Sequence, residues 1–145
     1  MKFQVHSRYN MMAALPPEEP WAAISICEKG DFPVIQENDH MQGRLNLQFH
    51  DADGFAYEEQ GTEVILFDEA MARKVLDFYQ AQEAAGTSVI YVHCLMGQSR
   101  SAAVAAALTK ALTGDDSKYF RPGPYKPNML VFRKVLDECH ERGLI

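Results

Sequence analysis

The segment from Cys94 to Ser101 combines a nucleophile, a glycine and a cation. It follows the β-branched run TSVIYVH at 87–93 and precedes a largely apolar stretch from Ser101 to Leu112. A short loop between a strand and a helix N-terminus gathers backbone N–H groups around one point, and the helix dipole adds positive potential there. An oxyanion is therefore the expected guest of this loop.

Three side-chain types in the segment suit phosphate chemistry. Cys94 lies in the positive field of the helix, which lowers the pKa of a thiol and favours the nucleophilic thiolate. The planar guanidinium of Arg100 matches two oxygens of a phosphoryl group, as a lysine does not. Gly97 permits a backbone conformation that a side chain would forbid. Together these parts indicate cleavage of a phosphate ester through a cysteinyl-phosphate.

A family resemblance rests on the same residues. His93-Cys94-x5-Arg100-Ser101 matches the H-C-x5-R-(S/T) signature of protein tyrosine phosphatases, and H-C-x-x-G-x-S-R-S is the form common in dual-specificity phosphatases. Weaker similarity extends to the strand ISIC, the segment LNLQFHD and the Pro127-Asn128 start of the last helix. The chain therefore resembles a minimal dual-specificity phosphatase catalytic domain.

The resemblance implies a role for each signature residue. Cys94 would be the nucleophile, and Arg100 would bind the phosphoryl oxygens. Ser101 would hydrogen-bond the sulfur and help it leave, whereas His93 would orient the loop and tune the thiolate. The phosphate site would be completed by the backbone N–H groups of Leu95, Met96, Gly97, Gln98, Ser99 and Arg100.

Cleavage also needs an acid that protonates the leaving oxygen. The resemblance puts it in the loop after the strand expected at 44–49, where the sequence reads His50-Asp51-Ala52-Asp53. Asp51 is the first candidate and Asp53 the second, although paired aspartates are also typical of turns. No group of His, Cys and Asp has metal-ligand spacing, so neither a metal nor a cofactor is expected.

Cys27 is a candidate resolving thiol. If the strands ending at Cys27 and at His93 are parallel neighbours, Cys27 and Cys94 lie at the same edge of the sheet. A phosphoinositide phosphatase of this superfamily has a cysteine at the matching strand end that captures its oxidised nucleophile. Cys27 would then trap an oxidised Cys94 as a disulfide. The alternative is that Cys27 only fills the core.

The elements that position these residues alternate between strands and helices, which predicts an α/β fold. We expect a small, mostly parallel central sheet of about four to five strands, flanked by helices on both faces. The chain, residues 1–145, reads as a single catalytic domain. The expected strands are 1–5 at the edge, 21–27, 44–49 and 87–93, with 28–43 as a loop.

The helices have recognisable ends. After a turn or short helix through Leu15, we expect one from Asp68 to Ala85, one over 99–113, and one from Asn128 to a stop at Gly143. Asp68 and Asn128 are expected N-caps. One face of the first long helix would carry Met71, Val75, Phe78 and Ala85. The segment 45–72 has seven acids and no Lys or Arg, and is either a solvated acidic loop or a mobile flap carrying the acid.

Composition limits the partners. The net charge of −6 repels polyphosphate backbones, so neither nucleic acid nor an anionic membrane is an expected partner. Three cysteines, an odd number, argue against a disulfide framework. No secretory signal or membrane-spanning run is evident. We expect a cytoplasmic monomer.

The expected substrate is a phosphomonoester on a protein or a small aryl phosphate. Leu95, Met96 and Gln98 are uncharged, which disfavours an inositide or an RNA triphosphate end. The sequence thus predicts a cysteine-dependent phosphatase for phosphotyrosine, with phosphoserine and phosphothreonine left open. The alternatives are a catalytically silent domain that binds phosphorylated residues, and a redox or sulfurtransfer enzyme that uses Cys94.

Overall fold

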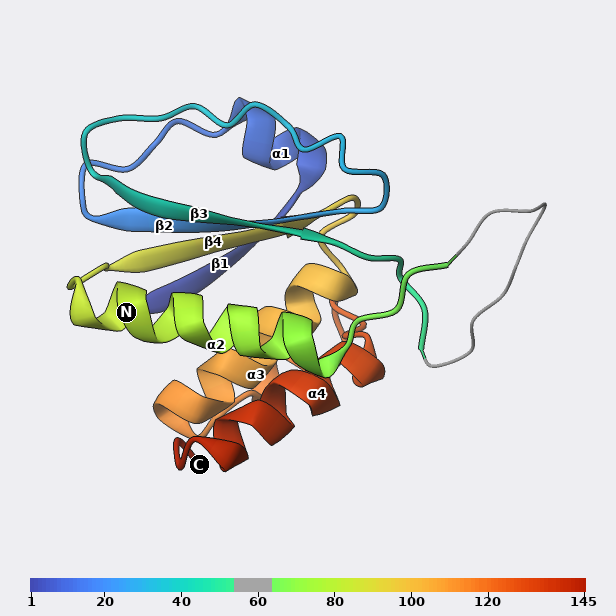
Figure 1. The fold of residues 1–145 in the computed structure, drawn as a ribbon. Helices are drawn as coiled ribbons and strands as arrows, with labels where there is room; N and C mark the ends of the chain where they lie inside the picture. Colours follow the sequence, from blue (N-terminus) through green and yellow to red (C-terminus); the bar gives the residue numbers. More distant parts are fainter. Residues whose placement is uncertain (54–63) are drawn as a thin grey trace.

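The computed structural model describes residues 1–53 and 64–145, and these form a parallel sheet with helices on its faces (Figure 1). The strands are β1 (Lys2–Ser7), β2 (Trp21–Cys27), β3 (Met41–Gln48) and β4 (Val89–Cys94). They form a four-stranded sheet in the order β1-β4-β2-β3, in which every neighbouring pair is parallel. The carboxyl ends of β1, β2 and β4 therefore meet at one edge.

The helices divide unequally between the two faces of the sheet. Figure 1 shows α2 (Glu69–Ala84), α3 (Arg100–Thr113) and α4 (Met129–Glu141) on one face. The short α1 (Arg8–Ala13) lies on the other face, together with the loop over 28–40. A short 3-10 helix, Ser117–Tyr119, lies between α3 and α4 in the chain. Both faces are covered as expected, but the second face is covered largely by loop.

Burial explains why β2 and α3 consist largely of apolar residues. All seven residues of β2 are buried, because a central parallel strand is covered on both faces. The run from Arg100 to Leu108 in α3 is also fully buried, since this helix lies between the sheet and α4. Small alanine side chains let α3 approach both neighbours closely. The face of the sheet that α1 covers has a separate small hydrophobic core, which consists of Met11, Trp21, Ala23, Ile35 and Val89.

The predicted caps and glycine stops are confirmed. Asp68 Oδ1 accepts a hydrogen bond from the Met71 N–H at 2.9 Å, and Asn128 Oδ1 accepts one from the Val131 N–H at 3.2 Å. Gly114 ends α3 at φ 79°, a left-handed conformation that favours glycine. The sequence therefore marks the helix ends well.

Three details differ from the sequence-based expectations. β3 starts at Met41, inside the segment expected to be a loop, because pairing with β2 extends to Trp21. β4 includes Cys94. The α2 face is rotated: Val75 is buried as predicted, Met71 and Phe78 are only partly buried, and Ala85 is an exposed C-cap. The residues that α2 buries are Ala72, Val75, Leu76, Tyr79 and Gln82.

Part of the acidic segment lies outside the described residues. Glu58, Glu59 and Glu63 belong to that part, and so does most of the expected flap. Its described ends are joined: His50 N–H donates to the Ile65 carbonyl at 2.8 Å, and Ile65 N–H donates to His50 Nδ1 at 3.0 Å. In the described ranges, no helix is long and apolar enough to cross a bilayer.

The packing of α3 yields a stability test. Ala105 is fully buried, so Ala105→Leu should overpack the core and lower the free energy of unfolding by about 1–3 kcal/mol. The matched control, Ala84→Leu, changes an exposed residue of α2 and should stay within about 0.5 kcal/mol of the parent. Urea unfolding measures both. Equal midpoints for the two variants would contradict the close packing of α3.

Candidate active site

The loop between β4 and α3 is held from outside by neighbouring segments. The Leu95 carbonyl accepts from the Arg8 N–H at 3.1 Å, the Gln98 carbonyl from the Lys126 N–H at 2.8 Å, and the Ser99 carbonyl from the Asn128 N–H at 3.1 Å. In a trans peptide the following N–H points opposite to the carbonyl. The N–H groups of Met96, Ser99 and Arg100 therefore point away from these supports, as an anion site requires.

Gly97 lets this loop pack against the end of β1. Its φ is 70°, and a Cβ at this position would lie 2.6 Å from Ser7 N and 2.7 Å from His6 C. Both obstacles are backbone atoms that cannot rotate away. A side chain at position 97 would push the loop off β1, which explains the glycine of the signature.

Cys94 is placed and polarised as a nucleophile. Its Sγ lies 3.0 Å from Ser101 Oγ and accepts from the Gly97 N–H at 3.3 Å. Burial raises the pKa of this thiol, but hydrogen bonds from Ser101 and Gly97 and the charge of Arg100 outweigh burial, so its pKa lies below the ordinary range. These contacts therefore stabilise the thiolate relative to that of an ordinary cysteine.

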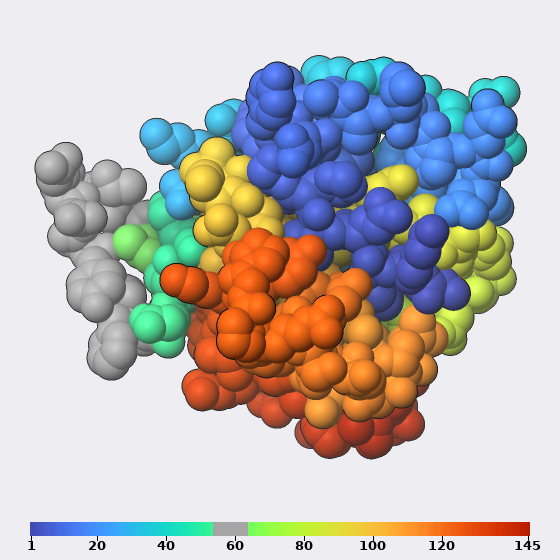
Figure 2. Space-filling view, turned by 180° about the vertical axis from the view of Figure 1, so that it is seen from behind, coloured from blue at the N-terminus to red at the C-terminus, as the bar shows by residue number. Residues whose placement is uncertain are grey.

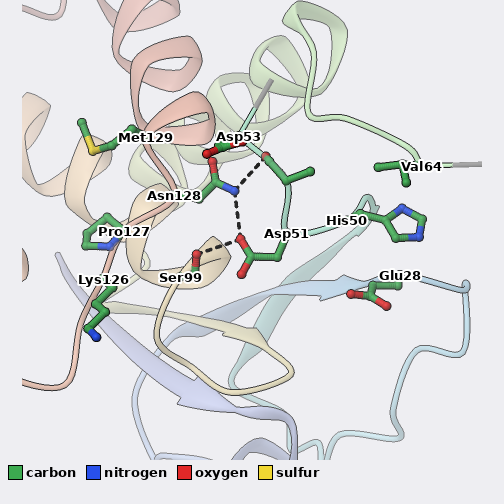
Figure 3. Close-up of a pocket in the computed structure, with 11 residues that line it drawn as sticks. Glu28, His50, Asp51, Asp53, Val64, Ser99, Lys126, Pro127, Asn128 and Met129 are labelled. Atoms are coloured by element: carbon green, nitrogen blue, oxygen red, sulfur yellow. Dashed lines mark hydrogen bonds between the residues drawn. The ribbon is translucent and has the colours of Figure 1, made fainter. Parts of the chain in front are cut away.

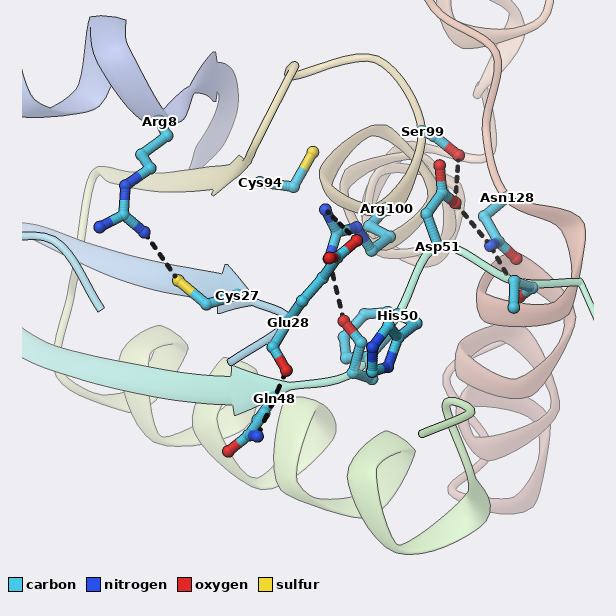
Figure 4. Close-up of polar contacts among 12 residues, drawn as sticks. Arg8, Cys27, Glu28, Gln48, His50, Asp51, Cys94, Ser99, Arg100 and Asn128 are labelled. Carbon is cyan, nitrogen blue, oxygen red and sulfur yellow. Dashed lines mark hydrogen bonds and ion pairs between the residues drawn. The ribbon is translucent and has the colours of Figure 1, made fainter. Parts of the chain in front are cut away.

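Arg100 is buried at the start of α3 (Figure 4). Its Nη1 donates to the Phe49 carbonyl at 2.9 Å, and its Nη2 lies 3.9 Å from Glu28 Oε1. Its Nε is buried and has no hydrogen-bond partner among the described residues. A buried donor without a partner is costly, so this nitrogen suits the oxygen of an anionic ligand.

His93 is fully buried and neutral. Desolvation lowers the pKa of its imidazole to about 4. Ser25 Oγ contacts Nε2, and Arg44 Nη2 donates to the same hydroxyl at 3.2 Å. The Cys94 carbonyl lies 3.4 Å from Nδ1 and can only accept, so Nδ1 carries the hydrogen and Nε2 accepts from the Ser25 hydroxyl. His93 thus contacts the carbonyl of Cys94 at the start of the loop, and its role in orienting the loop stays a prediction.

Asp51 is held at the mouth of the site by two side chains (Figure 3). Its Oδ1 accepts from Ser99 Oγ at 2.8 Å and from Asn128 Nδ2 at 2.9 Å. Both bonds end on the same oxygen, so Oδ2 remains available to carry a proton. Asn128 also donates to the Ala52 carbonyl at 3.0 Å. These bonds fix the position of Asp51, and its role as the acid stays a prediction.

Asp51 and Asp53 both line a cleft of about 520 Å³. Lys126 and Glu28 also line this cleft, with Asn128 opposite Asp51 (Figure 3). Asn128 was expected only as a helix cap, and Ser99 only as a backbone donor. Their contacts with Asp51 join positions far apart in the chain, and no local pattern indicates them.

Cys27 lies close to the site but on the other face of the sheet. Ser25 and His93 share one face, so Cys27, two residues after Ser25, faces that side, whereas Cys94 faces α3. Cys27 Sγ accepts from Arg8 Nη1 at 3.3 Å (Figure 4). Burial raises the pKa of its thiol. Its role as resolving thiol stays a prediction, and it requires one strand end to rearrange.

The remaining clusters do not resemble a metal centre. Within residues 1–53 and 64–145, no group of three or more His, Cys, Asp or Glu side chains is placed to hold a metal ion. Cys27, Cys94 and Cys139 are all free thiols.

Comparison with protein-family models and with curated proteins finds no match. Solved structures do match. The human tyrosine phosphatase-like serine/threonine/tyrosine-interacting protein is 19% identical over 99% of this chain and 94% of its own, with a TM-score of 0.64. PTPMT1 in complex with PI(5)P is 17% identical over 97% and 91%, with a TM-score of 0.60. Human DUSP28 is 15% identical over 97% and 94%, with a TM-score of 0.57.

These likenesses identify the fold. The described residues have the α/β fold of dual-specificity phosphatases, with a parallel central sheet, as the sequence predicts. The H-C-x5-R-S signature occupies the turn from β4 to α3 in this fold.

The contact between Ser101 and Cys94 yields a second test. Ser101→Ala removes a hydrogen bond that favours the thiolate, so the pKa of Cys94 should rise towards that of an ordinary thiol. The pH dependence of Cys94 alkylation by iodoacetamide, followed by mass spectrometry, measures this pKa. Ser88→Ala, at the other end of β4, is the control and should leave the profile unchanged. An unchanged profile for Ser101→Ala would contradict the assigned contact.

Proposed function

We propose that this chain is a cysteine-dependent phosphatase that hydrolyses phosphomonoesters, phosphotyrosine in proteins above all, through a phosphocysteine. The observation that carries the proposal is the buried Cys94 Sγ, which accepts from Gly97 N–H and lies 3.0 Å from Ser101 Oγ, at the N-terminus that holds Arg100. A thiolate stabilised next to an anion site suits nucleophilic attack on phosphorus.

In the first step the Cys94 thiolate attacks phosphorus, the S–P bond forms and the P–O bond to the leaving group breaks. Arg100 and the loop N–H groups bind the oxygens of the transferred phosphoryl group, where charge gathers in the transition state. Protonated Asp51 gives its proton from Oδ2 to the leaving oxygen. Ser99 and Asn128 hold Oδ1 during this transfer.

In the second step water attacks the phosphocysteine. Asp51, now a carboxylate, takes a proton from that water, and the S–P bond breaks to release inorganic phosphate. The Ser101 hydroxyl donates to the departing sulfur, in keeping with its position near Sγ. Each carboxyl and thiol returns to its starting state, so the scheme needs no cofactor. The free thiols support a reducing compartment such as the cytoplasm.

A silent phosphoresidue-binding domain is the second candidate. The observation in its favour is the likeness to a human protein described as tyrosine phosphatase-like and as an interacting protein. The presence of Cys94, Arg100 and Asp51 at one site favours turnover instead. Turnover of p-nitrophenyl phosphate distinguishes the two candidates.

Substitution of the nucleophile and of the cation tests the mechanism. Cys94→Ser should abolish turnover of p-nitrophenyl phosphate and retain phosphate binding. Arg100→Lys keeps the charge but loses the planar fork, so kcat/KM should fall by about 10²–10³-fold. Steady-state kinetics and phosphate binding by calorimetry provide the measurements. Appreciable turnover by Cys94→Ser would end the proposal.

A matched pair of variants tests the acid. Asp51→Asn should lower kcat by about 10²–10⁴-fold and flatten the basic limb of the pH–rate profile. Asp53→Asn is the control and should retain most of the activity. The loss at Asp51 should shrink with substrates whose leaving group departs without protonation. The reverse pattern between the two variants would move the acid to Asp53.

A further inference from the structure

A second, apolar hollow lies next to the signature loop. It has a volume of about 480 Å³, and side chains from the end of β1, from α1 and from the loop line it. In Figure 2 the N-terminal segment, in blue, lies directly beside the loop after β4, in gold. We call this feature the α1 hollow; its lining residues are Ser7, Arg8, Tyr9, Met12, Leu95 and Met96.

The large apolar side chains of the α1 hollow are unusually exposed. Tyr9 is 78% exposed, Met96 65%, Leu95 56% and Met12 45%. Single exposed apolar residues are ordinary, but several together on one concave surface mark a binding site. Nothing in the phosphate chemistry requires apolar side chains at positions 95 and 96, because the loop binds an anion through its backbone. The side chains of Leu95 and Met96 are therefore available to contact another part of a substrate.

The α1 hollow is continuous with the catalytic site. Arg8 and Leu95 line it and also line a neighbouring cavity of about 240 Å³, to which Cys27 and Arg100 contribute. A ligand whose phosphoryl group reaches Arg100 would thus pass over Leu95 towards Tyr9 and Met12. An extended peptide advances about 3.3 Å per residue, so a side chain one or two residues from the phosphorylated one can reach the hollow.

The charges around the site select among apolar ligands. Glu28 and Asp31 line the cavity that joins the hollow to Arg100, together with Arg8 and Lys29, and Asp51 and Asp53 line the cleft on the other side, together with Lys126. The whole chain carries a net charge of −6. This net charge repels an anionic lipid surface, whereas it does not oppose the binding of a neutral apolar side chain of a peptide. The charge pattern therefore favours a peptide over a membrane.

We propose that the α1 hollow binds an apolar side chain that flanks the phosphorylated residue of a protein substrate. The proposal rests on the proposed phosphatase function and adds a substrate preference to it. Tyr9 and Met12 are the specificity residues that lie outside the catalytic loop. Burying one aliphatic side chain against them should tighten binding by about tenfold.

Peptide binding to the trapping variant Cys94→Ser tests the preference without turnover. Two labelled phosphotyrosyl peptides, with leucines or with serines on both sides of the phosphotyrosine, are titrated by fluorescence anisotropy. We expect the leucine peptide to bind about tenfold tighter. Adding Tyr9→Ser and Met12→Ser should bring the ratio of the two Kd values to about one. Adding Leu112→Gln, which changes an exposed residue at the far end of α3, should preserve the ratio.

Other results would overturn the preference. Equal Kd values for the two peptides would do so, and so would a ratio that survives Tyr9→Ser with Met12→Ser in a folded protein, as judged by circular dichroism. If these substitutions instead weaken binding to vesicles of phosphatidylserine and phosphatidylcholine, the hollow is a membrane site. If they only dissociate a dimer in sedimentation, it is a contact between copies of the chain.

Turnover of p-nitrophenyl phosphate separates this proposal from the proposed function. The small ester does not reach the α1 hollow, so Tyr9→Ser with Met12→Ser should leave its kcat/KM within about twofold of the parent. A parent chain that binds the leucine peptide selectively but hydrolyses no ester would refute the phosphatase and keep the hollow. A parent that hydrolyses the ester but shows no peptide preference would refute the hollow alone.

Discussion

The close contact between the signature loop and the end of β1 is the constraint on which the rest of the site depends. Gly97 approaches the backbone of His6 and Ser7 so closely that no side chain fits. That contact, with the hydrogen bond from the Arg8 N–H to the Leu95 carbonyl, holds the loop against the end of β1. The parallel pairing of β1 with β4 supplies the register that makes this approach possible. The position of Cys94 and of the loop that follows it therefore depends on the pairing of β4 with β1.

Both an oriented dipole and a formal charge lie close to Cys94. His93 is neutral because it is buried, so it contributes a fixed dipole rather than a positive charge. Ser25 contacts its Nε2 on the face of the sheet away from α3, and Arg44 donates to the Ser25 hydroxyl. The positive charge near the sulfur comes instead from Arg100, on the helix side. His93 thus contacts the Cys94 carbonyl from one face of the sheet, and Arg100 acts on the sulfur from the other.

Local signals in the sequence predict the signature loop, the caps at Asp68 and Asn128, and the alternating α/β order. Each of these depends on residues that are neighbours in the chain. The early start of β3 at Met41 and the rotated face of α2 depend on tertiary contacts, and periodicity alone does not locate them. The same holds for the hydrogen bonds from Ser99 and Asn128 to Asp51, which join positions separated by 48 and 77 residues. The residue types of the site can thus be found from the sequence, whereas the side chains that donate hydrogen bonds to Asp51 cannot.

The carbonyl of Phe49 connects Arg100 to the acidic segment 45–72. Arg100 donates to this carbonyl, and the Phe49 ring packs edge-on against Phe67 with 5.0 Å between ring centroids. The paired hydrogen bonds between His50 and Ile65 close the same junction. Residues 49–50 and 65–67 therefore pack together at the edge of the core, and Phe49 binds the guanidinium of Arg100. A substitution that displaces residues 49–50 or 65–67 would therefore also displace the guanidinium of Arg100, because the two are joined through the Phe49 carbonyl.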